Sequence, residues 1–125
     1  MSLWFVIIFL VAVGIVLCGR FFSKMNFFRR RVPASLEKLY STVSSKMPFE
    51  VFSEVWLKIG EAYSIDARLI LPNDKFKDFN SFDSWYLGKG EETLALWCQA
   101  QHLDIPSKFD TTLELAEQLA NQRRK

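Results

Sequence analysis

LWFVIIFLVAVGIVLC, residues 3–18, is an unbroken apolar stretch, and the first charge after it is Arg20. Hydrocarbon cannot hydrogen-bond a backbone, so an apolar segment of this length is stable as a helix in lipid or deep in a core. At about 1.5 Å per residue, residues 1–19 would cover roughly 28 Å, close to the ~30 Å of a bilayer interior. Phe21 and Phe22 extend the span if Arg20 directs its guanidinium to the headgroups. We therefore predict a transmembrane helix over residues 1–19.

Two other interpretations of this stretch exist. A cleaved secretory signal would have positive charge before the apolar run and an Ala-x-Ala-like site after it. The chain instead begins MSLW and continues CGRFFSK after the run. A buried core helix normally has polar residues along one face, and this stretch has none. Both comparisons favour a retained anchor. Cys18, at its end, is a candidate for lipidation.

A basic segment follows the apolar stretch. Residues 20–31 carry five positive charges and no acid: Arg20, Lys24, Arg29, Arg30 and Arg31. Lys and Arg beside a span are retained on the cytoplasmic side. We therefore predict a single-pass protein of the inner (cytoplasmic) membrane with a cytoplasmic C-terminal domain. Aromatic residues lie between the bases, as in an interfacial segment that binds anionic headgroups. A nucleic-acid-binding patch is the competing interpretation, and the adjacent span favours lipid.

The remainder of the chain is acidic, although the formal net charge is +2. Residues 20–31 carry +5 and residues 123–125 carry +3, whereas residues 32–122 hold eight Lys or Arg against fourteen Asp or Glu, a net charge of −6. Anionic lipid repels an acidic domain, so we expect this part to stand off the membrane. We also expect it to bind basic proteins rather than nucleic acid.

Residues typical of catalysis and metal binding are scarce. The single histidine, His102, does not allow a Cys/His metal cluster, and the two cysteines, Cys18 and Cys98, lie in different predicted environments. The sequence has no nucleophile elbow, no P-loop and no G-x-G-x-x-G motif. We therefore expect no catalytic residue, no metal site and no enzymatic activity.

Helical periodicity begins after the basic segment. Residues 33–46 predict a short linker helix with Ser35 as its N-cap. A stronger helix starts at Pro48, because proline suits a first helical position. Its apolar residues recur at steps of three and four: Phe49, Phe52, Trp56, Ile59 and Tyr63. This stripe predicts a core-facing helix.

The second half of the chain predicts two more helices after a long connection. Residues 64–90 form a hydrophobic loop, and residues 91–102 a helix with acids in its first turn. Residues 111–122 form the last helix, opened by a T-x-x-E capping box and with Leu113, Ala116, Leu119 and Ala120 as its buried stripe. Without period-two alternation, we predict an all-α fold. Its parts are a transmembrane helix (1–19), a basic juxtamembrane segment and linker helix (20–47) and a small helical bundle (48–125).

The order of these elements resembles the acyl carrier protein fold, over about residues 49–120. LILPNDKFKDF (69–79) is similar to the carrier-protein loop in which an apolar residue, Pro and Asp precede a buried Phe. FDSW (82–85) resembles the Asp-Ser-Leu element whose serine accepts 4′-phosphopantetheine. EETLALW (91–97) and LDIPSKFDTTLELAEQL (103–119) resemble the second helix and the Ile-Pro and terminal-helix region.

The resemblance implies a prosthetic group on Ser84, preceded by Asp83, near a helix N-terminus whose amides would stabilise the phosphate. It implies that Glu91 and Glu92 belong to an acidic face read by basic residues of acyl-transfer enzymes. Counting back from the Ile-Pro pair places the modified position near Leu87, so the match requires an insertion within WYLGKG. In the alternative interpretation, Ser84 merely caps a turn.

Two functions follow from these observations. The first is a membrane-anchored, acyl-carrier-like protein that acts as a non-catalytic cytoplasmic carrier or docking module. Its partners would be membrane lipids and basic proteins such as acyl-transfer enzymes. The alternative is a membrane-tethered interaction or regulatory protein with a degenerate carrier fold and no prosthetic group. The two differ in whether Ser84 is modified.

Overall fold

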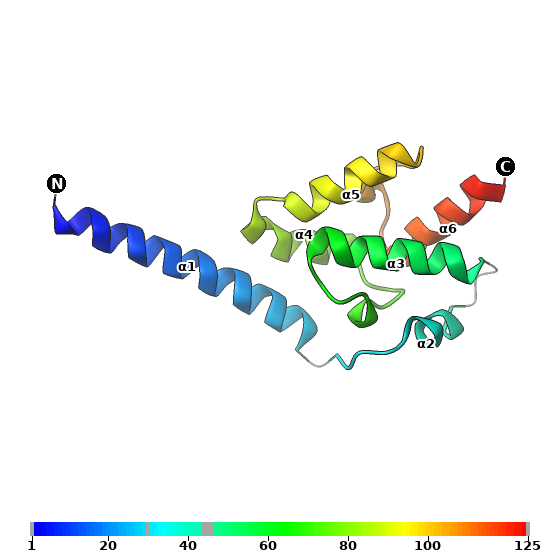
Figure 1. Ribbon diagram of the computed structural model, residues 1–125, viewed down its shortest axis with the longest axis horizontal. Helices are drawn as coiled ribbons and strands as arrows, with labels where there is room; N and C mark the ends of the chain where they lie inside the picture. The colour runs from blue at the N-terminus through cyan, green and yellow to red at the C-terminus, as the bar shows by residue number, and fades with distance from the viewer. Residues whose placement is uncertain (1, 30, 44–46, 125) are drawn as a thin grey trace.

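A computed structural model describes residues 2–29, 31–43 and 47–124 of the chain. Over these ranges the protein forms α-helices and 3₁₀ turns and no strand, which confirms the all-α prediction (Figure 1). In chain order the elements are α1 (Leu3–Phe28), α2 (Leu36–Ser41), α3 (Phe49–Tyr63), η1 (Ala67–Leu69), α4 (Phe76–Asp83), η2 (Ser84–Tyr86), α5 (Lys89–Ala100), η3 (Pro106–Lys108) and α6 (Thr112–Arg124).

The N-terminal helix α1 projects away from a bundle made by the other helices (Figure 1). It is long and apolar enough to cross a membrane, and none of its side chains is buried. The helix does not end near Gly19, where the sequence predicts the end of the span, but continues to Phe28. No proline interrupts this region, so the backbone hydrogen bonds continue through the basic segment.

Helix α3 is the centre of the bundle, with α5 and α6 packed against it. Four of the five residues of its predicted stripe are buried, namely Phe52, Trp56, Ile59 and Tyr63, whereas Phe49 is only partly buried at the edge of the core. The rings of Phe52 and Trp56 stack with centroids 4.2 Å apart. The indole Nε1 of Trp56 donates to the carbonyl of Ile70 at 3.0 Å, so the largest core side chain also satisfies its polar atom.

The structure corrects the prediction of a continuous loop over residues 64–90, because α4 and two 3₁₀ turns lie within it. Phe76, Phe79 and Phe82 follow one another at steps of three and are all buried. This spacing gives α4 one apolar face. The helix has only eight residues, among them Asn80 and Ser81, which favour turns in isolation. Tertiary packing of the three phenylalanines therefore decides the structure here.

Helix α2 packs against the bundle, whereas the sequence predicts a linker helix at this position. The hydroxyl of Ser35 accepts from the amide of Lys38 at 3.2 Å, which confirms the predicted N-cap. Leu39 and Met47 are buried in the main core, so the core includes residues before Pro48. The predicted helix end at 44–46 lies outside the described residues.

Helix α6 closes the bundle. Thr111 Oγ1 accepts from the amide of Glu114 at 3.4 Å, and the carboxylate of Glu114 accepts from the amide of Asp110 at 2.8 Å. The predicted capping box therefore forms, except that the Glu114 carboxylate accepts from the amide one residue before Thr111 and not from that of Thr111 itself. The buried stripe consists of Leu115, Ala116, Leu119 and Ala120. The prediction of Leu113 in this stripe is thus corrected to Leu115, since Leu113 is only partly buried.

Candidate functional site

The last turns of α1 have two different faces. Six half-buried residues share one face at helical spacing: Gly19, Arg20, Ser23, Lys24, Phe27 and Phe28. The opposite face exposes Phe21, Phe22 and Met25. The helix therefore presents one face to the bundle and keeps an apolar face free.

Two of the predicted interfacial bases bind the bundle. Arg20 Nε donates to the carbonyl of Trp85 at 2.8 Å, and its guanidinium carbon lies 4.8 Å from the centroid of the Tyr86 ring. Lys24 Nζ lies 4.4 Å from the same centroid and donates to the carbonyl of Ser64 at 3.3 Å. Two cations thus lie close to the Tyr86 ring, and each is attracted to it by a cation–π interaction.

A third predicted interfacial base, Arg31, is part of the bundle. Its guanidinium forms two bonds to the carboxylate of Asp74 and a third, of 3.0 Å, to the carbonyl of Leu69. The same group lies 4.5 Å from the centroid of the Phe27 ring. Arg29 is exposed, and Arg30 lies outside the described residues. Three of the five bases therefore bind protein groups, where the sequence predicts contact with lipid headgroups.

Aromatic packing completes this junction between α1 and α4. The ring of Phe27 lies 5.2 Å from that of Phe79 and 5.3 Å from that of Phe82, between centroids. The indole of Trp85 lies against Gly19, where an added Cβ would come within 2.3 Å of the ring. The bundle is therefore fastened directly to the last turns of α1.

Ser84 follows α4 and precedes α5 by five residues. It is exposed, and its hydroxyl donates to the carbonyl of Ser81 at 2.7 Å, as in the turn-capping alternative. The residues that separate it from α5 form η2 and a left-handed pair, Leu87 and Gly88. This segment lies at the position where the carrier resemblance requires an insertion.

Asp83 is buried and caps α5. Its Oδ1 accepts from the amide of Gly90 at 2.9 Å and its Oδ2 from the amide of Glu91 at 3.0 Å. The carboxylate therefore occupies the helix N-terminus at which the resemblance implies a phosphate. Beside it, burial and then the charges of Asp83 and Glu91 raise the pKa of Tyr63 far above its ordinary value. The Tyr63 hydroxyl stays protonated and donates to Asn80 Oδ1 at 2.9 Å.

Glu91 and Glu92, the predicted partner-binding acids, lie in the first turn of α5. Glu92 is exposed, whereas Glu91 is half-buried beside the Asp83 cap. Acids at this position stabilise the helix through its dipole, independently of any partner.

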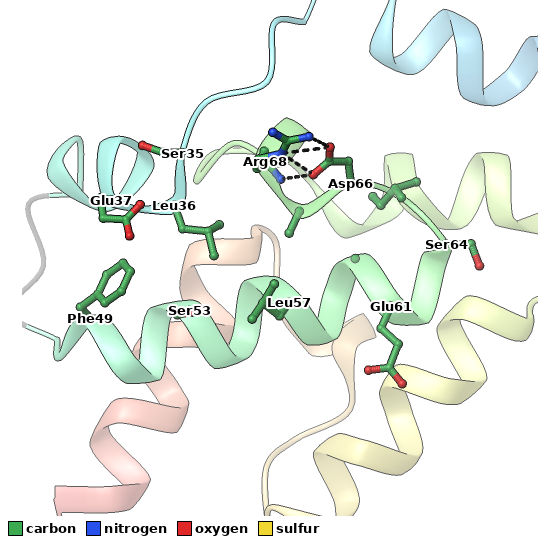
Figure 2. Close-up of a pocket in the computed structure, with 13 residues that line it drawn as sticks. Ser35, Leu36, Glu37, Phe49, Ser53, Leu57, Glu61, Ser64, Asp66 and Arg68 are labelled. Atoms are coloured by element: carbon green, nitrogen blue, oxygen red, sulfur yellow. Dashed lines mark hydrogen bonds and ion pairs between the residues drawn. The ribbon is translucent and has the colours of Figure 1, made fainter.

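An open groove of about 760 Å³ runs between α2, α3 and η1 (Figure 2). Its apolar lining includes Leu36, Phe49 and Leu57, and Leu57 is 55% exposed. The carboxylates of Glu37 and Glu61 lie toward opposite ends of this groove (Figure 2). Neither Glu91 nor Glu92 lines it.

The rest of the groove rim is polar. Asp66 and Arg68 pair with each other there, with Nη2 and Oδ2 2.7 Å apart (Figure 2). The Arg68 guanidinium, through its hydrogen bonds, lowers the pKa of the Asp66 carboxyl below its ordinary value. Glu61 forms a longer pair of 3.6 Å with Lys58 on its own helix.

Sequence reasoning missed the groove and the junction. One signal for the groove is present: Leu57 is an apolar residue of α3 that lies off the core stripe. One signal for the junction is Gly19, whose lack of a side chain permits close approach.

Comparison with known proteins adds no relative. No family model, curated protein or solved structure matches the chain. The carrier resemblance therefore depends on the sequence motifs, and a functional argument depends on the geometry.

Proposed function

We propose that this protein is a non-enzymatic docking module, anchored in the inner membrane by α1, which binds a basic segment of a partner protein in the groove between α2, α3 and η1. The observation that carries the proposal is the exposed Leu57 in the lining of this groove, with the carboxylates of Glu37 and Glu61 toward its two ends. Apolar side chains of a partner would cover Leu57, and Lys or Arg beside them would pair with Glu37 and Glu61.

The charge of the domain supports this choice of partner. Residues 32–122 have a net charge of −6, and the three junction bases Arg20, Lys24 and Arg31 offset only half of it. A positively charged segment would therefore be steered toward the bundle, whereas an acidic segment or a nucleic acid would be repelled.

The junction supports a fixed, membrane-proximal position for the groove. Ser64, at one end of the groove, accepts a hydrogen bond from Lys24 of α1. The groove is thus connected to the anchor without a flexible linker. With α1 in the membrane and the basic residues on the cytoplasmic side, a bound partner would be held close to the bilayer.

Photo-crosslinking tests this proposal on the full chain. The photoreactive residue p-benzoylphenylalanine replaces Leu57, or Leu96 as a matched control, and the protein is reconstituted in phosphatidylcholine nanodiscs. Both leucines are exposed, at 55% and 60%, and only Leu57 lines the groove. The probe is a synthetic amphipathic peptide of Leu and Lys, with a Leu and Glu peptide as its charge-reversed counterpart.

We expect the Leu and Lys peptide to crosslink at position 57 and not at 96. Reversing both rim acids, Glu37→Lys with Glu61→Lys, should weaken binding by about tenfold through like-charge repulsion. Equal crosslinking at both positions, or equal crosslinking by the Glu peptide at position 57, would overturn the proposal.

A second candidate function is the acyl carrier. What favours it is the exposed hydroxyl of Ser84, directly after an Asp and next to the loop before α5. What weighs against it is the Asp83 carboxylate, which already holds the first amides of α5. A phosphate on Ser84 would either lack these amide donors or displace the buried Asp83 carboxylate from them.

Intact-mass measurement separates the two candidates. The full chain is co-expressed with a broad-specificity phosphopantetheinyl transferase, alongside Ser84→Ala and, as a matched control, Ser81→Ala. The carrier function requires a mass gain of one 4′-phosphopantetheine that disappears with Ser84→Ala and persists with Ser81→Ala. An unmodified wild-type mass excludes it.

A further inference from the structure

The turn between α4 and α5 lies at the level of the span. Trp85 contacts α1 at Gly19, one residue before the first charge. At about 1.5 Å per residue, this contact lies about 24 Å along the helix from Leu3, within the ~30 Å of a bilayer interior. Figure 1 shows the α4 and α5 junction as the part of the bundle closest to the free N-terminal part of α1.

The turn exposes apolar side chains at this level. Leu87 is 86% exposed and Trp85 is 39% exposed. Leu87 has a left-handed backbone with φ of 60°. A branched apolar residue is uncommon in this conformation, which glycine and asparagine adopt more readily. The bundle therefore leaves the apolar side chain of Leu87 uncovered at this turn.

The outer face of α1 sets the depth of the bilayer. Phe21 and Phe22, which follow Gly19, are 63% and 53% exposed on the face opposite the bundle. Lipid that covers these two side chains extends past the level at which Trp85 touches Gly19. The bilayer boundary on the bundle side therefore lies at or beyond Trp85.

The charges around the turn suit a lipid surface. Lys89, the first residue of α5 after the turn, is exposed. Arg20 and Lys24 lie 4.8 and 4.4 Å from the centroid of the Tyr86 ring. Of the acids that flank the turn, Asp83 is buried and bonded to the α5 amides, Glu91 is half-buried beside it, and Glu92 is exposed in the first turn of α5. Trp and Tyr are enriched at the membrane boundary, and Lys reaches anionic headgroups from there.

We propose that Trp85, Leu87 and Lys89 form a second membrane contact, here called the membrane lip, which inserts into the headgroup and acyl-chain boundary beside α1. The occupant of this surface is the lipid bilayer, because the lip is continuous with the exposed apolar surface of α1. Two contacts, the helix and the lip, fix the tilt of the bundle on the membrane. This inference rests on the membrane anchor of the proposed function and is independent of the docking groove.

Depth-dependent fluorescence quenching tests the membrane lip on the full chain. Single cysteines carrying the dye NBD replace Leu87, Ile8 of α1, or Leu96, in a Cys18→Ser background. Cys98 stays unlabelled, since it is buried and burial raises the pKa of its thiol to about 11. The protein is reconstituted in vesicles of equal parts phosphatidylcholine and phosphatidylglycerol, with and without brominated lipid. Leu87 and Leu96 are matched exposed leucines, at 86% and 60%.

We expect quenching by brominated lipid at positions 8 and 87, at least about threefold stronger at 87 than at 96. Quenching at 8, with positions 87 and 96 equally unquenched, would overturn the lip and leave the anchor intact. An unquenched position 8 would overturn the anchor, and the lip with it.

Discussion

Arg31 and Asp74 form an ion pair with two parallel bonds, Nη1 to Oδ2 at 2.5 Å and Nη2 to Oδ1 at 2.6 Å. The Asp74 side chain is only 6% exposed, and its Oδ2 also accepts from the amide of Leu71 at 2.7 Å. Arg31 follows α1, and Asp74 lies in the LPNDKF loop that resembles carrier proteins. The pair therefore joins the basic segment to the core-forming loop of the bundle.

We predict that Arg31→Ala destabilises the full chain by about 3 kcal/mol, because it leaves a buried carboxylate without its partner. Arg29→Ala is the matched control, since Arg29 is exposed two residues earlier, and it should change stability by less than about 0.5 kcal/mol. Chemical unfolding in detergent micelles, followed by circular dichroism, measures both. Equal effects of the two substitutions would show that the ion pair does not stabilise the fold.

Gly19 and Gly14 give a second matched pair, on α1. We predict that Gly19→Leu separates α1 from η2, because an added Cβ would come within 2.3 Å of the Trp85 ring. At Gly14 an added Cβ meets no atom within 4 Å, so Gly14→Leu should leave the junction intact. Amide hydrogen exchange of residues 84–88 in nanodiscs measures the separation. Faster exchange with both substitutions, or with neither, would contradict this role of Gly19.

The Asp83 cap predicts a specific weakness of α5. Asp83→Ala should destabilise the bundle by about 2 kcal/mol, because two amides lose their acceptor in a buried position. Glu92→Ala, at an exposed position in the first turn of the same helix, should cost about 0.5 kcal/mol or less. Thermal unfolding of the two variants gives the comparison. A small loss of stability with Asp83→Ala would mean that water replaces the carboxylate as acceptor. The N-terminus of α5 would then be open to a phosphate.

Local pattern predicted the helical class, the long apolar N-terminal helix and the core face of α3, because each depends on residues close in sequence. Phe52, Trp56, Ile59 and Tyr63 can be placed together without knowledge of the rest of the chain. The capping residues Ser35 and Thr111 were predicted for the same reason, since a cap bonds within its own first turn.

The junction depends on contacts that periodicity does not contain. Arg31 and Asp74 are 43 residues apart, and Arg20 and the Trp85 carbonyl are 65 apart. A base beside an apolar span suggests headgroup contact in any such sequence, and only tertiary packing shows that these bases bind protein groups. The groove escaped prediction similarly, because it forms where α2 and η1 leave Leu57 uncovered.

The end of α6 provides a prediction on pH. Arg123 of α6 binds both carboxylate oxygens of Glu54 on α3, at 2.5 and 2.8 Å. This hydrogen bonding lowers the pKa of Glu54 below its ordinary value of 4.5. A carboxyl with a lowered folded-state pKa stabilises the fold above its unfolded pKa, and this contribution is lost as the pH falls through the folded-state value.

We therefore predict that Glu54→Gln lowers stability at pH 7 and that its difference from wild type disappears as the pH falls well below 4.5. Both partners are about 40% exposed, so solvent screening limits the effect to about 0.5 kcal/mol. Glu50→Gln, at an exposed position on the same helix, is the control and should leave the pH profile unchanged. Unfolding midpoints of the variants and the wild type, measured between neutral and acid pH, test this prediction. A difference between Glu54→Gln and wild type that persists at low pH would assign the effect to packing rather than to charge.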